Sequence, residues 1–187
     1  MIKQKKQLII LCLVLILAIV ALVLVFELPT EEEADETQSY PITTLDQETV
    51  NKFSFANDGG TYHFTRQDDR WSFDDDKSVD IDETIVERMI GKVTSLSALN
   101  CIEDVEDIAQ YGFDEPAASI QISDGTTAYT ILIGDYNDLT GTYYLCLESD
   151  QETVYTTDSY TVSDFLDNSI DTLTVQEEES ETATPIE

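Results

Sequence analysis

An uninterrupted apolar run lies near the start of the chain and limits every later inference about its fold. Residues 8–26 have the sequence LIILCLVLILAIVALVLVF, 19 residues without a charge. At a rise of about 1.5 Å per residue, a helix of this length covers roughly 28 Å, close to the thickness of a hydrocarbon core. The run predicts a transmembrane helix over residues 8–26, so a globular domain has to come from the sequence after it.

A cleaved secretory signal peptide is the competing interpretation of this run. Signal peptides have apolar cores of about 7–15 residues that end at a small-x-small cleavage site. Here the run is longer and ends in Val25-Phe26-Glu27, which offers no such site. An uncleaved anchor is therefore the preferred interpretation.

The charges on the two sides of the run are very unequal. Lys3, Lys5 and Lys6 lie in the basic tail, residues 1–7, which holds no acid. The chain has 9 Lys and Arg against 39 Asp and Glu, so the part after the run has 6 bases (9 less 3) and a net charge of −33. The positive-inside rule predicts a single-pass cell-membrane protein with a cytoplasmic N-terminus and an extracytoplasmic domain. A surface this acidic argues against nucleic acid as a partner.

Two segments after the run lack the apolar residues that a folded core needs. Polar and acidic side chains dominate residues 27–41 and residues 176–187. Such segments repel themselves and bury little apolar surface, so they stay unfolded. We expect an acidic disordered linker over 27–41, an α+β domain over 42–175 and an acidic disordered tail over 176–187.

Alternating apolar residues predict that this domain is mainly an antiparallel β-sheet. Period-two alternation is typical of strands with one buried face. After residue 117 the alternation returns, with Ile, Tyr and Leu residues recurring as far as Tyr155, and we expect a loop over residues 134–138 to interrupt it. At the start of the domain, three pairs of aromatic residues are spaced two apart and separated by turn sequences: Phe53 and Phe55, Tyr62 and Phe64, Trp71 and Phe73.

One main helix is predicted to follow the third strand and to pack on the sheet. Asp80 or Asp82 can cap its N-terminus, and Glu83 stands three residues after Asp80, as in a capping box. We expect Trp71 to fill the space between strand and helix; the alternative is an exposed aromatic residue that binds a partner. Apolar residues then recur at helical spacing: Ile85, Met89, Ile90, Val93 and Leu96.

The two halves of the domain resemble each other weakly. Thr61-Tyr62, a turn, residues 71–74 and a capped helix form the first unit. Thr142-Tyr143, a turn, residues 154–158 and a short closing helix form the second. We interpret this as a weak internal repeat of a strand–strand–helix unit.

The sequence predicts no catalytic, cofactor-binding or metal-binding residue. His63 is the one histidine, and nothing marks a nucleophile that it would activate. The acids of Asp74-Asp75-Asp76 suggest calcium, but a calcium loop counted from Asp74 needs Gly and Glu where Val79 and Ile85 stand. Cys101 and Cys146 lack zinc-ligand spacing, and they form either a disulfide or two buried thiols.

The order of several short motifs resembles the domain of unknown function 4340 family. The resemblance covers roughly residues 42–175, and Phe113 departs from it mildly, because the family usually has Leu there. The motifs are Trp71 before a helix, Tyr111-Gly112-Phe113-Asp114-Glu115-Pro116, Ile131-Leu132-Ile133-Gly134, Tyr143-Tyr144 and Val154-Tyr155. The resemblance implies an envelope protein, in some members an accessory component found with ABC-transporter permeases. It implies no activity and no catalytic residues.

These observations favour a non-enzymatic interaction or accessory module of the cell envelope. The membrane holds it through residues 8–26, and a membrane protein such as an ABC-transporter permease is the partner that the resemblance suggests. An envelope-associated enzyme or a calcium-binding surface protein is the alternative. No cofactor is expected.

Overall fold

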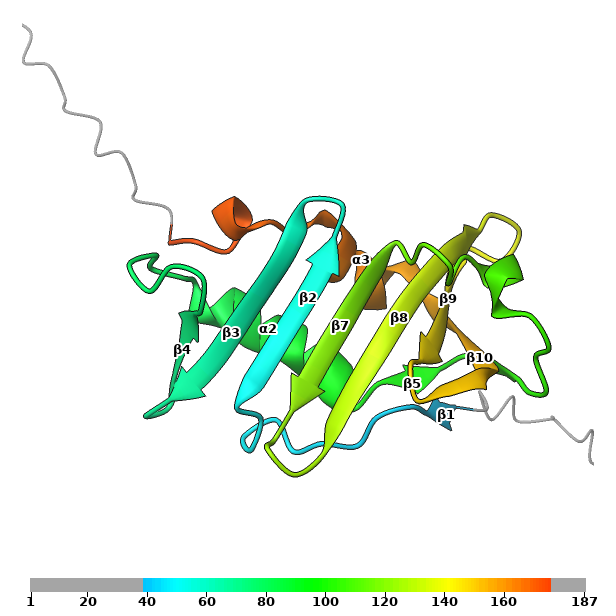
Figure 1. The fold of residues 1–187 in the computed structure, drawn as a ribbon, viewed down its shortest axis with the longest axis horizontal. Coiled ribbons are helices and arrows are strands. Elements are labelled where there is room, and N and C mark those ends of the chain that lie inside the picture. The colour runs from blue at the N-terminus through cyan, green and yellow to red at the C-terminus, as the bar shows by residue number, and fades with distance from the viewer. Residues whose placement is uncertain (1–38, 176–187) are drawn as a thin grey trace, which may run out of the picture. The chain divides into compact units, whose positions relative to one another are not determined.

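The computed structural model describes residues 39–175, which form an eight-stranded antiparallel sheet with two helices on one face (Figure 1). The strand order is β4-β3-β2-β7-β8-β9-β10-β6. The predicted class, α+β with a mainly antiparallel sheet, is confirmed. The strands are β2 (Lys52–Asn57), β3 (Gly60–Gln67), β4 (Arg70–Phe73), β6 (Asn100–Ile102), β7 (Ala118–Ser123), β8 (Ala128–Asn137), β9 (Thr142–Leu147) and β10 (Asp150–Asp158).

A two-stranded sheet stands beside the main one. It pairs β1 (Tyr40–Pro41) with β5 (Ser97–Ala98) in antiparallel register. The folded domain therefore includes two residues that precede its expected start at residue 42.

Helix α2 (Glu83–Thr94) is capped at its N-terminus by Asp82, whose carboxylate accepts a hydrogen bond from the Thr84 backbone N–H at 2.9 Å. Of the two caps that the sequence allowed, the structure uses the second. Glu83 does not complete a capping box with Asp80, because its carboxylate accepts a hydrogen bond from the Trp71 backbone N–H at 3.0 Å. It thereby occupies an outward-facing donor of the edge strand β4, which would otherwise be free to pair with another chain.

The closing helix, α3 (Ser159–Asp167), lies on the same face as α2 (Figure 1). Asp158 caps it by accepting from the Thr161 N–H at 2.9 Å. The order β3, β4, α2 thus recurs as β9, β10, α3, with an aspartate at the start of each helix, as the predicted repeat requires. Two short 3₁₀ turns complete the domain, η1 (Ile108–Tyr111) and η2 (Ile170–Thr172).

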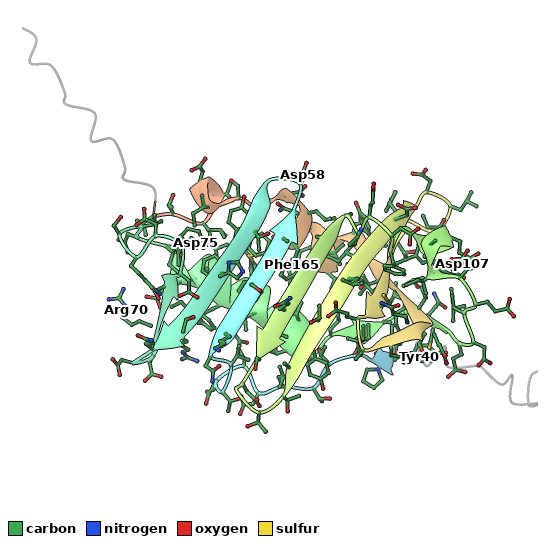
Figure 2. All side chains as sticks on the ribbon, in the orientation of Figure 1. Tyr40, Asp58, Arg70, Asp75, Asp107 and Phe165 are labelled. Atoms are coloured by element: carbon green, nitrogen blue, oxygen red, sulfur yellow. The ribbon has the colours of Figure 1, made fainter. Side chains whose placement is uncertain are left out.

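The main core lies between the sheet and these two helices. The aromatic pairs predicted from the sequence point into it, and Trp71 is 4% exposed. The sequence missed Val86, which is fully buried, and Leu96, expected on the helical stripe, is buried just beyond the end of α2. Phe165 of α3 packs edge-on against Phe53 and Phe55, and Figure 2 shows it behind the sheet.

A second, smaller core covers part of the opposite face. Phe113, Cys146 and Val154 are buried there, with Ile108 and Tyr111 of η1 packed against them. Gly112 ends this turn in the left-handed conformation, at φ 84°. This segment covers the β9–β10 end of the sheet and leaves β3, β2, β7 and the start of β8 open.

Strand β8 is longer than the sequence indicated. Residues 134–138 were expected to form a loop, but β8 continues to Asn137 through an irregular register between Ile133 and Tyr136. Gly134 makes this passage possible: a Cβ there would lie 2.1 Å from the Tyr111 carbonyl oxygen. Glycine is needed because the backbone of the η1 segment crosses directly against the strand.

The predicted transmembrane helix at residues 8–26 and the basic tail lie outside the described residues, as do the tail at 176–187 and the linker up to residue 38. Within residues 39–175, no helix has the length and apolar character needed to cross a bilayer.

Candidate functional site on the open face of the sheet

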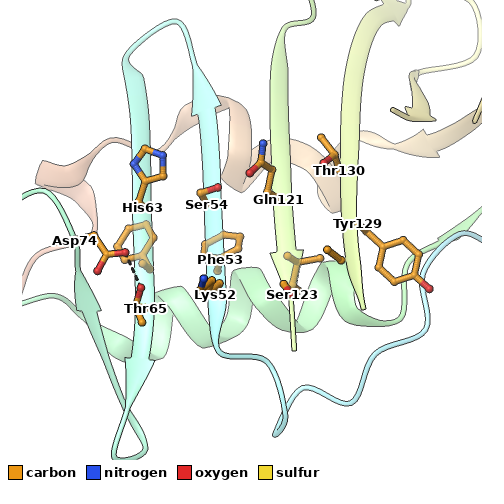
Figure 3. Close-up of a pocket in the computed structure, with 13 residues that line it drawn as sticks. Lys52, Phe53, Ser54, His63, Thr65, Asp74, Gln121, Ser123, Tyr129 and Thr130 are labelled. Atoms are coloured by element: carbon orange, nitrogen blue, oxygen red, sulfur yellow. Dashed lines mark hydrogen bonds between the residues drawn. The ribbon is translucent and has the colours of Figure 1, made fainter. Parts of the chain in front are cut away.

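The uncovered part of the sheet presents two rows of mostly polar side chains, which we call the open face. One row crosses the strands as His63, Ser54, Gln121 and Thr130, each directly paired with the next. The adjacent row is Thr65, Lys52, Ser123 and Ala128. Together they line a shallow depression of about 320 Å³ on the side away from the helices (Figure 3).

The same alternation that builds the core builds this face. Successive side chains of a strand point to opposite sides, so Lys52 and Ser54 face outward where Phe53 and Phe55 face the core. β7 repeats the pattern, with Gln121 outward between Ile120 and Ile122. The apolar half of the sequence pattern thus predicts the core, and its polar half predicts the open face.

The polar side chains at the rim of the depression have partners within the domain. Thr65 Oγ1 donates to Asp74 Oδ2 at 2.7 Å, and Ser123 Oγ accepts from the Gly125 N–H at 3.0 Å. His63 Nδ1 lies 3.4 Å from Asp75 Oδ2. Burial acts to raise the pKa of Asp74, but hydrogen bonds from Lys77 and Thr65 outweigh it and hold that pKa below its ordinary value.

The polar side chains at the centre of the depression have no such hydrogen-bond partners. The side chains of Lys52, Ser54, Gln121 and Thr130 form no hydrogen bond or ion pair with any other described residue. Of the six Lys and Arg among residues 39–175, the other five form ion pairs: Arg66, Arg70, Lys77, Arg88 and Lys92. Lys52 is therefore the one cation of the described region whose charge has no internal partner.

A catalytic triad would need a serine, a histidine and an aspartate in contact, and Ser54, His63 and Asp75 lie near one another at the open face. Their geometry does not support a triad. No hydrogen bond joins Ser54 to His63, and the side chains of His63 and Asp75 are 51% and 56% exposed. A triad also needs N–H donors aimed at an oxyanion. Ser54 lies in β2, whose backbone is paired on both sides, so this strand has no spare backbone N–H groups to form an oxyanion hole.

Three carboxylates of the acidic loop between β4 and α2 are engaged within the domain. Asp74 pairs with Lys77, Asp82 caps α2, and Asp76 accepts from the Ser78 backbone and hydroxyl. The two Ser78 hydrogen bonds lower the pKa of Asp76. Within residues 39–175, no group of three or more His, Cys, Asp or Glu side chains is arranged to hold a metal ion.

Cys101 and Cys146 are both free thiols. Cys101 pairs with Tyr155 across β6 and β10, and Tyr155 pairs with Leu145 across β10 and β9. These three residues share one face, so Cys146, next to Leu145, points to the other. The two cysteines are also two strand spacings apart, about 10 Å, too far for a disulfide. Burial, followed by the charge of Asp150, raises the pKa of Cys146 to about 12.

Comparison with known proteins gives a match to a protein family. The family model described as domain of unknown function (DUF4340) matches residues 71–178, more than half of the 187-residue chain. No curated protein matches the chain, and no solved structure does. The match spans β4 from Trp71 onward, both helices and the motifs around Tyr111 and Gly134. The chain therefore belongs to the DUF4340 family.

Proposed function

We propose that this protein is a non-enzymatic binding module of the cell envelope, held at the outer side of a membrane by residues 8–26, and that it binds through the open face. The observation that carries the proposal is the contrast between the two sides of strands β2 and β7. One side is sealed by α2 and α3, and the other leaves four neighbouring polar side chains without internal partners. Unused donors and acceptors in one depression are what a ligand site requires.

A binding role is favoured over an enzymatic one by the chemistry that the open face offers. Ser54 has no base within hydrogen-bonding distance, and Lys52 is exposed to solvent. The side chains can therefore orient and hold a polar ligand, but none of them is activated to attack it.

The proposed location rests on the apolar run and on the charge difference across it. Three lysines precede the run and 39 acids follow it. Within the same membrane, a transporter permease of the ABC type is the protein partner that we propose, because the family resemblance suggests accessory components of such transporters. The module would then present its ligand beside that partner.

Site-specific photocrosslinking in native membranes tests the proposal. A photoreactive benzoylphenylalanine at Gln121 lies in the depression, and the same residue at Thr84, exposed on α2, is the matched control. Benzophenones insert into C–H bonds of any ligand, whether protein or glycan. We expect a crosslinked species from position 121 that position 84 does not give. Equal products from both positions, or a product from position 84 alone, would contradict binding through the open face.

A further inference from the structure

We propose that the centre of the open face binds a hydroxyl-rich carboxylate, an acidic sugar of the uronate class. Lys52 holds the carboxylate, and Ser54, Gln121 and Thr130 bond to the hydroxyl groups. This inference rests on the proposed function, because it identifies the ligand of the same surface.

The charge of the ligand follows from Lys52. Lys52 stands in register between two hydroxyl-bearing residues, Thr65 on β3 and Ser123 on β7, and its ammonium group has no carboxylate partner among the described residues. The acid that lines the depression, Asp74, is already engaged by Lys77 and Thr65. A ligand carboxylate therefore meets one uncompensated positive charge at this point. Charges farther away on the acidic domain are screened within about 8 Å at physiological ionic strength.

The hydroxyl-rich character of the ligand follows from the neighbouring side chains. Ser54, Gln121 and Thr130 are adjacent in one cross-strand row, which spans two strand spacings, about 10 Å. Two hydroxyls and one amide provide both donors and acceptors in neutral form. The depression of about 320 Å³ is at the lower end of small-ligand sites, which measure roughly 300–1,000 Å³.

A protein surface fits the centre of the open face less well. Protein interfaces bury an apolar, often aromatic core, whereas the large exposed hydrophobic residues of the described region lie elsewhere: Leu99, Tyr136, Leu139, Tyr160 and Val175. An extended peptide that adds a strand needs a free sheet edge. β2 and β7 are central strands with partners on both sides, so they have none.

Saturation-transfer NMR on the full chain, in a zwitterionic detergent without sugar headgroups, tests the inference. The probes are D-glucuronate and D-galacturonate, with D-glucose and L-glutamate for comparison. The variants are Lys52→Met, Gln121→Ala and, as a matched loss of one cation on α2, Arg88→Met. We expect a uronate to bind, with its dissociation constant raised about fivefold by Lys52→Met, as for an exposed ion pair. Arg88→Met should leave it unchanged.

Three results would overturn the inference. The first is uronate binding that neither Lys52→Met nor Gln121→Ala weakens. The second is L-glutamate binding as tightly as the uronates and with the same dependence on Lys52, since the site would then recognise a carboxylate alone. The third is wild-type protein that binds neither uronate. If Gln121 still gives its specific crosslink in that case, only the ligand assignment fails; if the crosslink is also absent, the proposed function fails with it.

Discussion

Replacing Trp71 by alanine should remove a large part of the stability of the domain. Trp71 is 4% exposed, on the core side of β4, which α2 contacts. A buried Trp withdraws roughly 200 Å² from water, worth about 5 kcal/mol at 25 cal/mol per Å². Core Trp→Ala substitutions cost about 3–5 kcal/mol, against about 5–15 kcal/mol for a whole domain. We therefore expect Trp71→Ala to unfold the domain or to lower its urea midpoint severely.

The assay is urea denaturation followed by far-ultraviolet circular dichroism, since the variant loses the one tryptophan of the chain. His63→Ala is the control, because that side chain is 51% exposed and its replacement should cost less than about 1 kcal/mol. The wild-type protein should show the blue-shifted fluorescence of a buried indole. An unchanged midpoint for Trp71→Ala, together with emission typical of water, would refute the packing and favour an exposed binding aromatic.

Four further predictions address the second core, the thiols and the topology. Gly134→Ala should lower the free energy of unfolding by about 1–3 kcal/mol through its clash with the Tyr111 carbonyl, and a urea midpoint equal to wild type would show that the backbone yields there. Without reductant, a maleimide at pH 8 should spare Cys146 in the folded protein and modify both Cys101 and Cys146 after denaturation; labelling that needs a reductant would reveal a disulfide. Because the folded-state pKa of Cys146 is raised from 9.0 to about 12, an unfolded chain loses this proton first. The free energy of unfolding should then fall as pH rises from 9 toward 12. If it falls no more for the wild-type protein than for Cys146→Ala, the burial of Cys146 is contradicted. Protease added to intact cells should digest the chain after Glu27, and full protection in cells shown to be accessible would place the domain on the other side.

Local alternation was sufficient to predict the longer strands and most of the main core, because one buried face imposes a period of two on each strand. The aromatic pairs of β2, β3 and β4 are therefore visible in the sequence. The short strands β1, β5 and β6 were not predicted. The end of β8 was not predictable, because Gly134 and Asp135 have the composition of a turn. What keeps residues 134–137 in the strand is the η1 segment packed against Gly134, a contact between parts of the chain about 20 residues apart.

The sequence predicted that the residues of the candidate site face outward, but not that they lie side by side. Lys52, Ser54 and Gln121 stand at the polar positions of strands that were correctly predicted, yet nothing local marks them as neighbours. They meet because β2 pairs with β7 across the intervening residues 58–117, which also carry the whole of α2. The absence of an ion-pair partner for Lys52 depends on where the acids of other elements fall, and so emerges only in three dimensions.

Occupation of the open face in native membranes is the most direct test of its role as the binding surface. Gln121→Cys and, as the control on α2, Thr84→Cys are labelled with a maleimide in native membranes and after purification in detergent. The signal of the wild-type cysteines is subtracted from each. We predict that Gln121→Cys reacts several times more slowly in native membranes than after purification, whereas Thr84→Cys reacts at the same rate in both. Equal rates for Gln121→Cys in the two settings would mean that nothing covers the open face, and would contradict its role as the binding surface.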